Sequence, residues 1–141
     1  MSATHEGRPF LAVCFGHQVL SGVLDLPLRR RIVPNQGTQR EINLFGTRRR
    51  VGFCNTFEAV CGSDRFSADL ATGTVEVCRD RGSGAVHALR GQGFAAAQFH
   101  PESVLTTDGP VILGELLDAA DGSLAWSQVR LPAGASALAG R

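Results

Sequence analysis

A single stretch near the start of the chain, residues 10–18, constrains the fold more than any other. Four apolar residues, Phe10 to Val13, run into Cys14, and an amphipathic segment from 15 to 24 follows. This pattern predicts a buried strand, a sharp turn that carries Cys14, and a helix. The unpaired amides and the dipole at a helix N-terminus favour a thiolate, which is the form of cysteine that attacks a carbonyl carbon. Cys14 is therefore a candidate nucleophile.

A second motif follows another apolar run, at 94–97, and comprises residues 98–103. His100 and Glu102 are two residues apart, so in an extended chain their side chains point the same way. A carboxylate beside an imidazole can hold the ring in one tautomer and stabilise the imidazolium. Cys14, His100 and Glu102 together therefore form a hypothetical catalytic triad, with each motif at the end of a predicted strand.

Residues 13–18 and 99–103 together resemble the motifs of the class I (triad) glutamine amidotransferase family. The central segments 34–42, 45–46 and 50–57 narrow the resemblance to the amidotransferase domain of phenazine-pathway synthases, which aminate chorismate. The glutaminase subunits of anthranilate and 4-amino-4-deoxychorismate synthases are more distant relatives. The likeness covers roughly residues 9–120, and the long spacing between the two motifs is kept, which argues against a chance match.

The resemblance implies a role for each residue of the candidate site. Cys14 attacks the side-chain amide of glutamine, the Phe15 backbone N–H stabilises the oxyanion, and Gly16 leaves room for close approach. His100 is the base and Glu102 orients it. The resemblance also implies that glutamine is contacted by Gln18 and by a short polar turn whose backbone amides hold its α-carboxylate, at Asn55, Thr56 and Phe57.

The implied partners are glutamine and a chorismate-utilising synthase that receives the ammonia. The resemblance implies no metal or organic cofactor for the glutaminase half, and Mg²⁺ only in the partner synthase. Two other functions stay open: a catalytically impaired, truncated amidotransferase-like protein that acts as a binding or oligomerising module, and a cysteine hydrolase of γ-glutamyl compounds that uses the same triad.

Composition narrows the class of protein further. The 141 residues are 43% hydrophobic and 19% charged, with a net charge of +1, which suits one globular domain and gives no electrostatic case for nucleic acid or an anionic membrane. The four cysteines, at 14, 54, 61 and 78, lack zinc-like spacing and suit a reducing cytoplasm. No apolar run approaches the roughly 20 residues that a membrane span needs.

The expected fold is α/β: a three-layer, flavodoxin-like class I amidotransferase fold, with a mostly parallel sheet and an antiparallel excursion. We expect a disordered N-terminus (1–8), a partial amidotransferase domain (9–125) and a loose tail (126–141). A C-terminal helix starts after Asp108 as N-cap and packs through Val111, Leu113, Leu116 and Leu117. The expected strands are 9–14, 28–33, 36–44, 47–53, 74–79, 85–89 and 94–99.

The start of the chain departs from the family pattern. Nothing before Phe10 resembles the strand–helix–strand region, with its glycine- and proline-rich oxyanion loop, that precedes the cysteine strand in the family. The missing part is explained by truncation, by a second polypeptide that supplies it, or by the chain being a remnant. A sheet without its first strands exposes an edge, so we expect poor solubility or a tight dimer, with strand exchange as one route.

The two arginine runs are expected to be solvated faces of strands. Arg29-Arg30-Arg31 has a functional alternative as a docking surface for a synthase partner, and for Arg48-Arg49-Arg50 a phosphate site is the less favoured interpretation.

Overall fold

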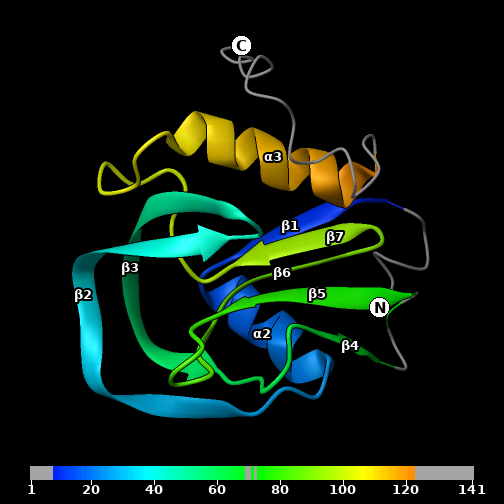
Figure 1. Ribbon diagram of the computed structural model, residues 1–141, viewed down its shortest axis with the longest axis horizontal. Helices are drawn as coiled ribbons and strands as arrows, with labels where there is room; N and C mark the ends of the chain where they lie inside the picture. Colours follow the sequence, from blue (N-terminus) through cyan, green and yellow to red (C-terminus); the bar gives the residue numbers. More distant parts are fainter. Residues whose placement is uncertain (1–7, 69–70, 72, 123–141) are drawn as a thin grey trace.

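The computed structural model describes residues 8–68, 71 and 73–122 of the chain (Figure 1). Within them, two helices flank a five-stranded sheet, and a long two-stranded ribbon curves around one end of it. The elements in chain order are β1 (Phe10–Val13), α2 (Phe15–Val23), β2 (Leu28–Leu44), β3 (Thr47–Ala59), β4 (Arg65–Ser67), β5 (Thr74–Arg79), β6 (Val86–Gly91), β7 (Phe94–Ala97) and α3 (Gly109–Asp121).

The described sheet is mixed, in the order β1-β7-β6-β5-β4. Only β1 and β7 pair in parallel, with Phe10 opposite Phe94 and Val13 opposite Ala97, while the other three pairs are antiparallel. Parallel pairing therefore does not dominate in these strands, contrary to our expectation. The reason is that strands β4 to β7 are joined by connections of a few residues, which suit antiparallel neighbours and are too short for a parallel crossover.

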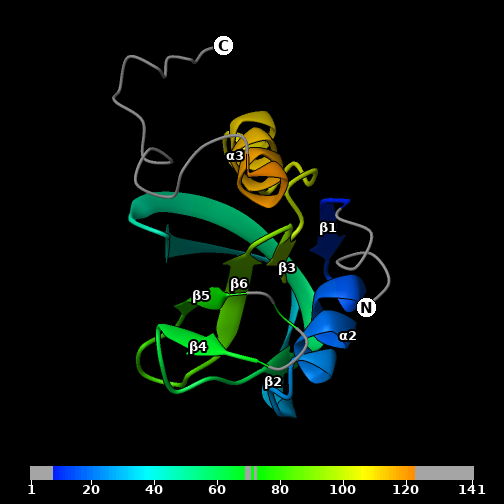
Figure 2. The ribbon, with the colours of Figure 1, turned by 90° about the vertical axis from the view of Figure 1, so that its right-hand side faces the viewer.

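Side chains alternate across the sheet and build a core on each face. Ala95 and Ala97 of β7 belong to a buried cluster with Ile112 and Leu116 of α3. Phe94 and Ala96 point to the other face, where a second cluster includes Leu20 and Leu24 at α2. The two helices thus cover opposite faces (Figure 2), and the predicted three-layer α/β architecture is confirmed.

Helix α3 packs through a different stripe from the one that we predicted. Its buried side chains are Ile112, Leu116, Ala119 and Ala120, at the spacing of one helical face. Of the predicted contacts only Leu116 is in the core, whereas Val111 and Leu117 are exposed. Asp108 is the N-cap residue as predicted, but its side chain makes no capping hydrogen bond and instead lies 3.8 Å from Arg49 Nη1.

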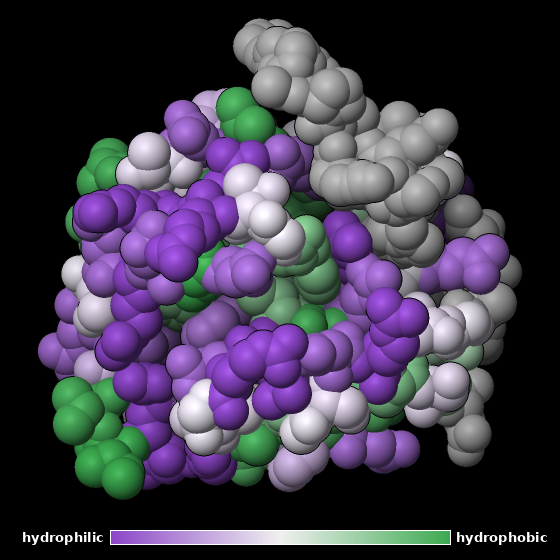
Figure 3. Space-filling view, in the orientation of Figure 1, coloured by the Kyte–Doolittle hydropathy of each residue, from purple (hydrophilic) through white to green (hydrophobic). Residues whose placement is uncertain are grey.

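The ribbon of β2 and β3 is longer than the separate strands that we predicted. The turn at Phe45 and Gly46 is confirmed: both have positive φ angles (50° and 104°), and Asn43 Oδ1 accepts a hydrogen bond from the Gly46 amide at 2.7 Å. The pairing register shifts between Arg30 and Asn35, so β2 bulges there instead of ending. Ile32 and Val33, within this bulge, are 99% and 69% exposed, and Figure 3 shows apolar side chains at the corner over β2.

Ion pairs hold several of the arginines that we expected to be solvated. Arg29 Nε and Arg31 Nη1 contact the two oxygens of one buried carboxylate, Glu58, at 2.9 and 2.7 Å. Arg49 Nη2 lies 2.7 Å from Glu115 Oε2 and ties the ribbon to α3, so the prediction of a solvated face is wrong for this residue. Arg48 is exposed as predicted.

The strands around residues 80–84 and the strand that leads to the His100 motif are also confirmed, within a residue or two. Most of the predicted N-terminal segment (1–8) and the whole tail (126–141) lie outside the described residues. None of the helices in the described part of the chain is both long and apolar enough to span a membrane.

Candidate active site

Cys14 lies at the junction of β1 and α2, as the sequence predicts. It is the N-cap residue of α2, with φ 55° and ψ −109°, a conformation that is unusual for a residue other than glycine. Its amide donates to the carbonyl of Ala97, the last residue of β7, at 2.8 Å. Helix α2 and strand β1 are in contact at this turn, since a Cβ added to Gly16 would lie 3.5 Å from Ala12 Cβ, an ordinary van der Waals distance. The backbone thus presents the thiol at the carboxyl end of the sheet.

Two polar groups surround the partly buried thiol. Cys14 Sγ donates to the Cys54 carbonyl at 3.8 Å, and Gln98 Nε2 donates to Sγ at 3.8 Å. Burial raises the pKa of the Cys14 thiol above its ordinary value, and the nearby Cys54 and Glu102 act in the same direction. The Phe15 backbone amide, which hydrogen-bonds to the thiol, acts in the opposite direction. A thiol in this environment is mostly protonated at neutral pH and needs a base.

His100 and Glu102 form a direct pair, with His100 Nδ1 2.7 Å from Glu102 Oε2. Burial acts to raise the pKa of Glu102, but its own backbone amide and the contact with His100 outweigh this, so the pKa is below its usual value. The carboxylate therefore stays ionised at neutral pH and holds the imidazole with its Nε2 edge facing away from Glu102.

The segment that carries His100 is fastened to the middle of β3. The His100 amide donates to the Gly52 carbonyl at 2.9 Å, and the Gly52 amide donates to Thr106 Oγ1 at 2.9 Å. The Thr106 hydroxyl donates in turn to the His100 carbonyl at 2.6 Å. Sequence reasoning missed Gly52 and Thr106, because nothing in their spacing links them to the His100 motif.

The parallel pairing of β1 and β7 brings the two motifs into one region. Cys14 follows β1 directly and His100 comes three residues after β7, so both lie at the carboxyl ends of neighbouring strands. Catalytic groups usually occupy this edge in open α/β sheets. Glu102 is near enough to influence the Cys14 thiol electrostatically. The fold thus places the candidate nucleophile and the candidate base at the same edge of the sheet.

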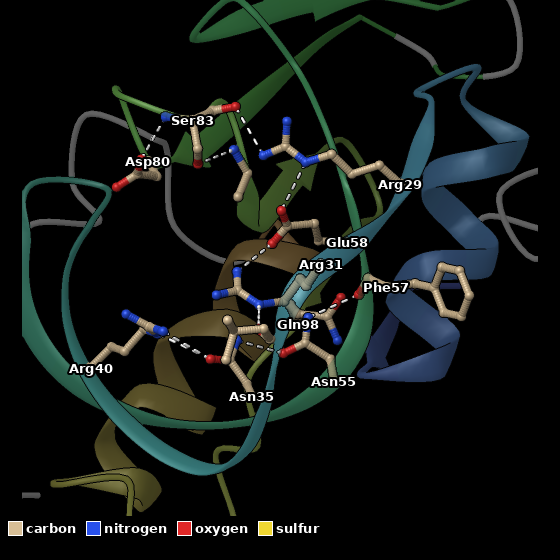
Figure 4. A network of polar contacts seen from close by, with 12 residues as sticks. Arg29, Arg31, Asn35, Arg40, Asn55, Phe57, Glu58, Asp80, Ser83 and Gln98 are labelled. Carbon is tan, nitrogen blue, oxygen red and sulfur yellow. Dashed lines mark hydrogen bonds and ion pairs between the residues drawn. The ribbon is translucent and has the colours of Figure 1, made fainter.

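A chain of side-chain amides runs from Asn35 of β2 to Gln98, which contacts the thiol; Figure 4 shows Asn35, Asn55, Phe57 and Gln98 of this chain. Gln18 Nε2 donates both to the Phe57 carbonyl at 2.9 Å and to Gln98 Oε1 at 3.1 Å. Asn55 Nδ2 donates to the same Phe57 carbonyl at 2.8 Å, and Asn55 Oδ1 accepts from Asn35 Nδ2 at 3.0 Å. Gln18 and Asn55 thus meet at one backbone oxygen, and Gln98 connects Gln18 to Cys14 Sγ.

The predicted polar turn at Asn55, Thr56 and Phe57 is wrong, because these residues lie inside β3. The Asn55 side chain is buried against its ladder partner Asn35, and the Phe57 ring packs on the outside of the ribbon, 5.7 Å from the Arg30 guanidinium. Asn55 and Phe57 pair with Asn35 and Arg30 on either side of the register shift, and the Phe57 carbonyl accepts hydrogen bonds from the Gln18 and Asn55 side chains, so strand β3 continues through this segment without a turn.

A hollow of about 820 Å³ lies between the ribbon and the β5–β6 loop. Four arginines of β2 line it, at positions 29, 30, 31 and 40, together with His87 of β6. Glu58 engages Arg29 and Arg31, while Arg40 Nε and Nη2 donate to Asn35 Oδ1 at 3.2 and 3.0 Å. The docking role considered for residues 29–31 stays a prediction.

Among the described residues, no three histidine, cysteine or acidic side chains form a metal-binding group, and the four cysteines are free thiols.

Comparison with known proteins gives matches over most of the chain. The profile of the family described as "Glutamine amidotransferase class-I" matches residues 1–119. Proteins named "Anthranilate synthase, phenazine specific" from Pseudomonas fluorescens and Pseudomonas chlororaphis are each 56% identical over 116 residues, which is 82% of this chain and 18% of the relative. "Anthranilate synthase component 2" of Archaeoglobus fulgidus is 34% identical over 103 residues, or 73% of this chain and 57% of the relative.

The chain thus spans less than a fifth of the length of the two Pseudomonas relatives. Among solved structures, a Thermoplasma acidophilum protein described as one subunit of a GMP synthase has a similar fold. The TM-score is 0.57 at 16% identity, over 82% of this chain and 58% of the other.

Proposed function

Because this chain belongs to the class-I glutamine amidotransferase family, we propose that it hydrolyses glutamine and supplies ammonia to a chorismate-utilising synthase. The observation that carries this proposal is the strained Cys14 at the end of β1, beside the strand whose end leads to the His100–Glu102 pair. The proposed triad is Cys14 as nucleophile, His100 as base and Glu102 as the group that orients His100.

In the proposed reaction His100 first takes the proton of the Cys14 thiol, whose raised pKa makes a base necessary. The thiolate then bonds to the amide carbon of glutamine, and the carbonyl electrons move to oxygen, where the Phe15 amide stabilises them. When the tetrahedral intermediate collapses, the C–N bond breaks and His100 returns the proton to the departing ammonia. Water, deprotonated by His100, cleaves the thioester to release glutamate and the thiol.

The other site residues are assigned to binding. Gln18 and the segment of Asn55, Thr56 and Phe57 are assigned to holding the amino-acid end of glutamine. In support, Gln18 and Asn55 meet at the Phe57 carbonyl, and Gln18 also contacts Gln98, which reaches the thiol. Gly16, which has no side chain, leaves room for the close approach of the substrate. The half-reaction requires neither a metal nor an organic cofactor, and Mg²⁺ would belong to the synthase. Four free thiols fit a reducing, cytoplasmic setting.

The phenazine-specific names of the relatives at 56% identity favour a synthase that makes an aminodeoxyisochorismate or anthranilate type of product. In a reaction of this type, ammonia replaces an oxygen substituent of chorismate, so the partner must bind chorismate and shield the ammonia from water.

The test is an ammonia-release assay on the chain alone and with a phenazine-type chorismate-utilising synthase plus chorismate. We expect release with the synthase, an aminated chorismate product by mass spectrometry, and a loss of at least about a thousandfold in Cys14→Ser. Labelling of Cys14 by a glutamine analogue with an electrophilic carbon would support the nucleophile separately. An unlabelled Cys14 and no ammonia in either condition would favour the binding-module alternative. Hydrolysis of γ-glutamyl peptides without a synthase would favour the hydrolase alternative.

A further inference from the structure

Gln98 is a buried amide that touches the candidate nucleophile and has no role in the proposed reaction. Its side chain is 1% exposed, and its own backbone amide is fixed by a 2.9 Å hydrogen bond to the His87 carbonyl. Both ends of the side chain are engaged: Oε1 accepts from Gln18 Nε2 at 3.1 Å, and Nε2 donates to Cys14 Sγ at 3.8 Å. Such a side chain has a single orientation that satisfies its neighbours.

The hydrogen-bonding chemistry of the neighbours determines which end of Gln98 meets the sulfur. The Phe57 carbonyl can only accept, so Gln18 and Asn55 both direct their NH₂ groups to it. Gln18 Nε2 then donates to Gln98 as well, so the Gln98 oxygen must face Gln18 and its NH₂ must face Cys14. The same reasoning applies at the far end of the chain of amides. The Arg40 guanidinium can only donate, so Asn35 Oδ1 faces Arg40, and Asn35 Nδ2 is left to donate to Asn55 Oδ1.

We propose that Gln98 is an additional catalytic residue that donates a hydrogen bond to the Cys14 thiolate, with Gln18 as the residue that holds the Gln98 amide in the required orientation. The inference rests on the proposed function in that Cys14 is the nucleophile. When the proton leaves the thiol for His100, the N–H···S contact becomes charge-assisted and strengthens. Gln98 would then act with the Phe15 amide to oppose the effect of burial on the thiol.

The test measures the pH dependence of Cys14 alkylation by iodoacetamide, with the modified peptide quantified by mass spectrometry so that the other cysteines do not interfere. Gln98→Met keeps the length of the side chain and removes the donor, so its alkylation midpoint should move up by about one pH unit. Gln98→Glu replaces the donor with a carboxylate beside the thiolate and should move the midpoint further in the same direction.

The matched control is Gln92→Met, because Gln92 is a glutamine in the turn at the opposite end of β7, far from the thiol in the fold. Its profile should equal that of the wild type. Unchanged midpoints in folded Gln98→Met and Gln98→Glu, or an equal shift in Gln92→Met, would overturn the inference. If Gln98→Met does not fold, the alkylation midpoint of Gln18→Met is measured instead. Loss of the Gln18 hydrogen bond lets the Gln98 amide turn away from the thiol, so this midpoint should also rise, and an unchanged midpoint would overturn the inference.

Alkylation requires no glutamine turnover, so it separates this inference from the proposed function. A shifted midpoint in a chain that releases no ammonia supports the Gln98 contact and rejects the function. Ammonia release with unchanged midpoints supports the function and rejects the contact.

Discussion

At the scale of single residues, Cys14 combines the proposed chemistry with a strained backbone. A non-glycine residue in a sparsely populated region of φ/ψ space costs on the order of 1–3 kcal/mol. The hydrogen bond from its amide to Ala97, together with the packing of α2 against β1, holds Cys14 there. The strained turn thus lowers the stability of the fold, but it lets the thiol project from the end of the sheet.

Cys14→Gly should consequently be more stable than Cys14→Ala, by about 1 kcal/mol, because glycine adopts positive φ without a steric penalty. Both variants lack the thiol, so the difference between their unfolding free energies, measured by urea titration, reflects the conformational cost of the positive φ angle at this position. Both should be inactive. Equal stability of the two would show that φ 55° at this position carries no strain.

His17 is a second residue with an unusual environment, because it is fully buried in α2 and, among the described residues, neither ring nitrogen has a partner at good hydrogen-bond geometry, although the Val86 backbone acts to raise its pKa. Burial, and next the nearby His87, lower the pKa of His17 to about 4. In the unfolded chain an ordinary histidine titrates near 6.5. Between these values the unfolded state binds a proton that the native state does not.

Stability should therefore rise as the pH increases from about 4 to about 6.5, by up to the order of 3 kcal/mol from this residue. Replacing His17 with leucine removes this titration, so urea unfolding of His17→Leu should depend less steeply on pH across the same window. At pH 7, where the histidine is neutral, the variant should lose little stability. A slope identical to that of the wild type would contradict the assignment.

At the scale of structural elements, the segment after β7 depends on the ribbon for its position. Thr106 bridges Gly52 of β3 and the His100 carbonyl with one hydroxyl group. Gly52 must lack a side chain, since an added Cβ would lie 2.7 Å from Leu105 Cβ. The ribbon therefore serves the proposed site by fixing the backbone on both sides of the His100–Glu102 pair.

Thr106→Val keeps the shape of the side chain but removes both hydrogen bonds, which leaves the Gly52 amide and the His100 carbonyl with one partner fewer. We expect a loss of about 1–3 kcal/mol in unfolding free energy and a fall of about tenfold or more in kcat, because the base is displaced. Thr107→Val, at an exposed neighbouring position, is the control and should resemble the wild type. Wild-type kcat in Thr106→Val would show that the bridge does not position His100.

At the scale of the whole molecule, β1 forms one edge of the described five-stranded sheet. The amides of Phe10 and Cys14 bond toward the β7 side, so by alternation the amides of Leu11 and Val13 point to the open edge. Open edges pair readily with a strand from another chain.

We therefore retain the prediction that this 141-residue chain associates, as a dimer or larger species, and does so more strongly at higher concentration. Light scattering coupled to size-exclusion chromatography over a range of loading concentrations measures this directly. A single monomeric species at every concentration would contradict it.

The sequence alone determined the family, the two motifs and most element positions. The apolar runs before Cys14 and His100 predict two strands that end in functional residues, and the family resemblance drawn from these motifs is confirmed by the matching profile and the 56% identity. These features can be predicted from sequence because they are local. An apolar run and a turn residue determine the structure of only a few neighbouring positions.

Only the tertiary structure decided which distant residues meet. Strand pairing resumes after the bulge in β2, so Asn55 to Phe57 lie within β3, although their composition suggests a turn. Ion pairs to Glu58 and Glu115 partly bury Arg31 and Arg49, which look solvated in sequence. Likewise, Gln98 and Thr106 gain their contacts from partners 84 and 54 residues away. The physical reason is that hydrogen bonds and ion pairs depend on distances in space, and the sheet order that sets those distances is a property of the whole fold.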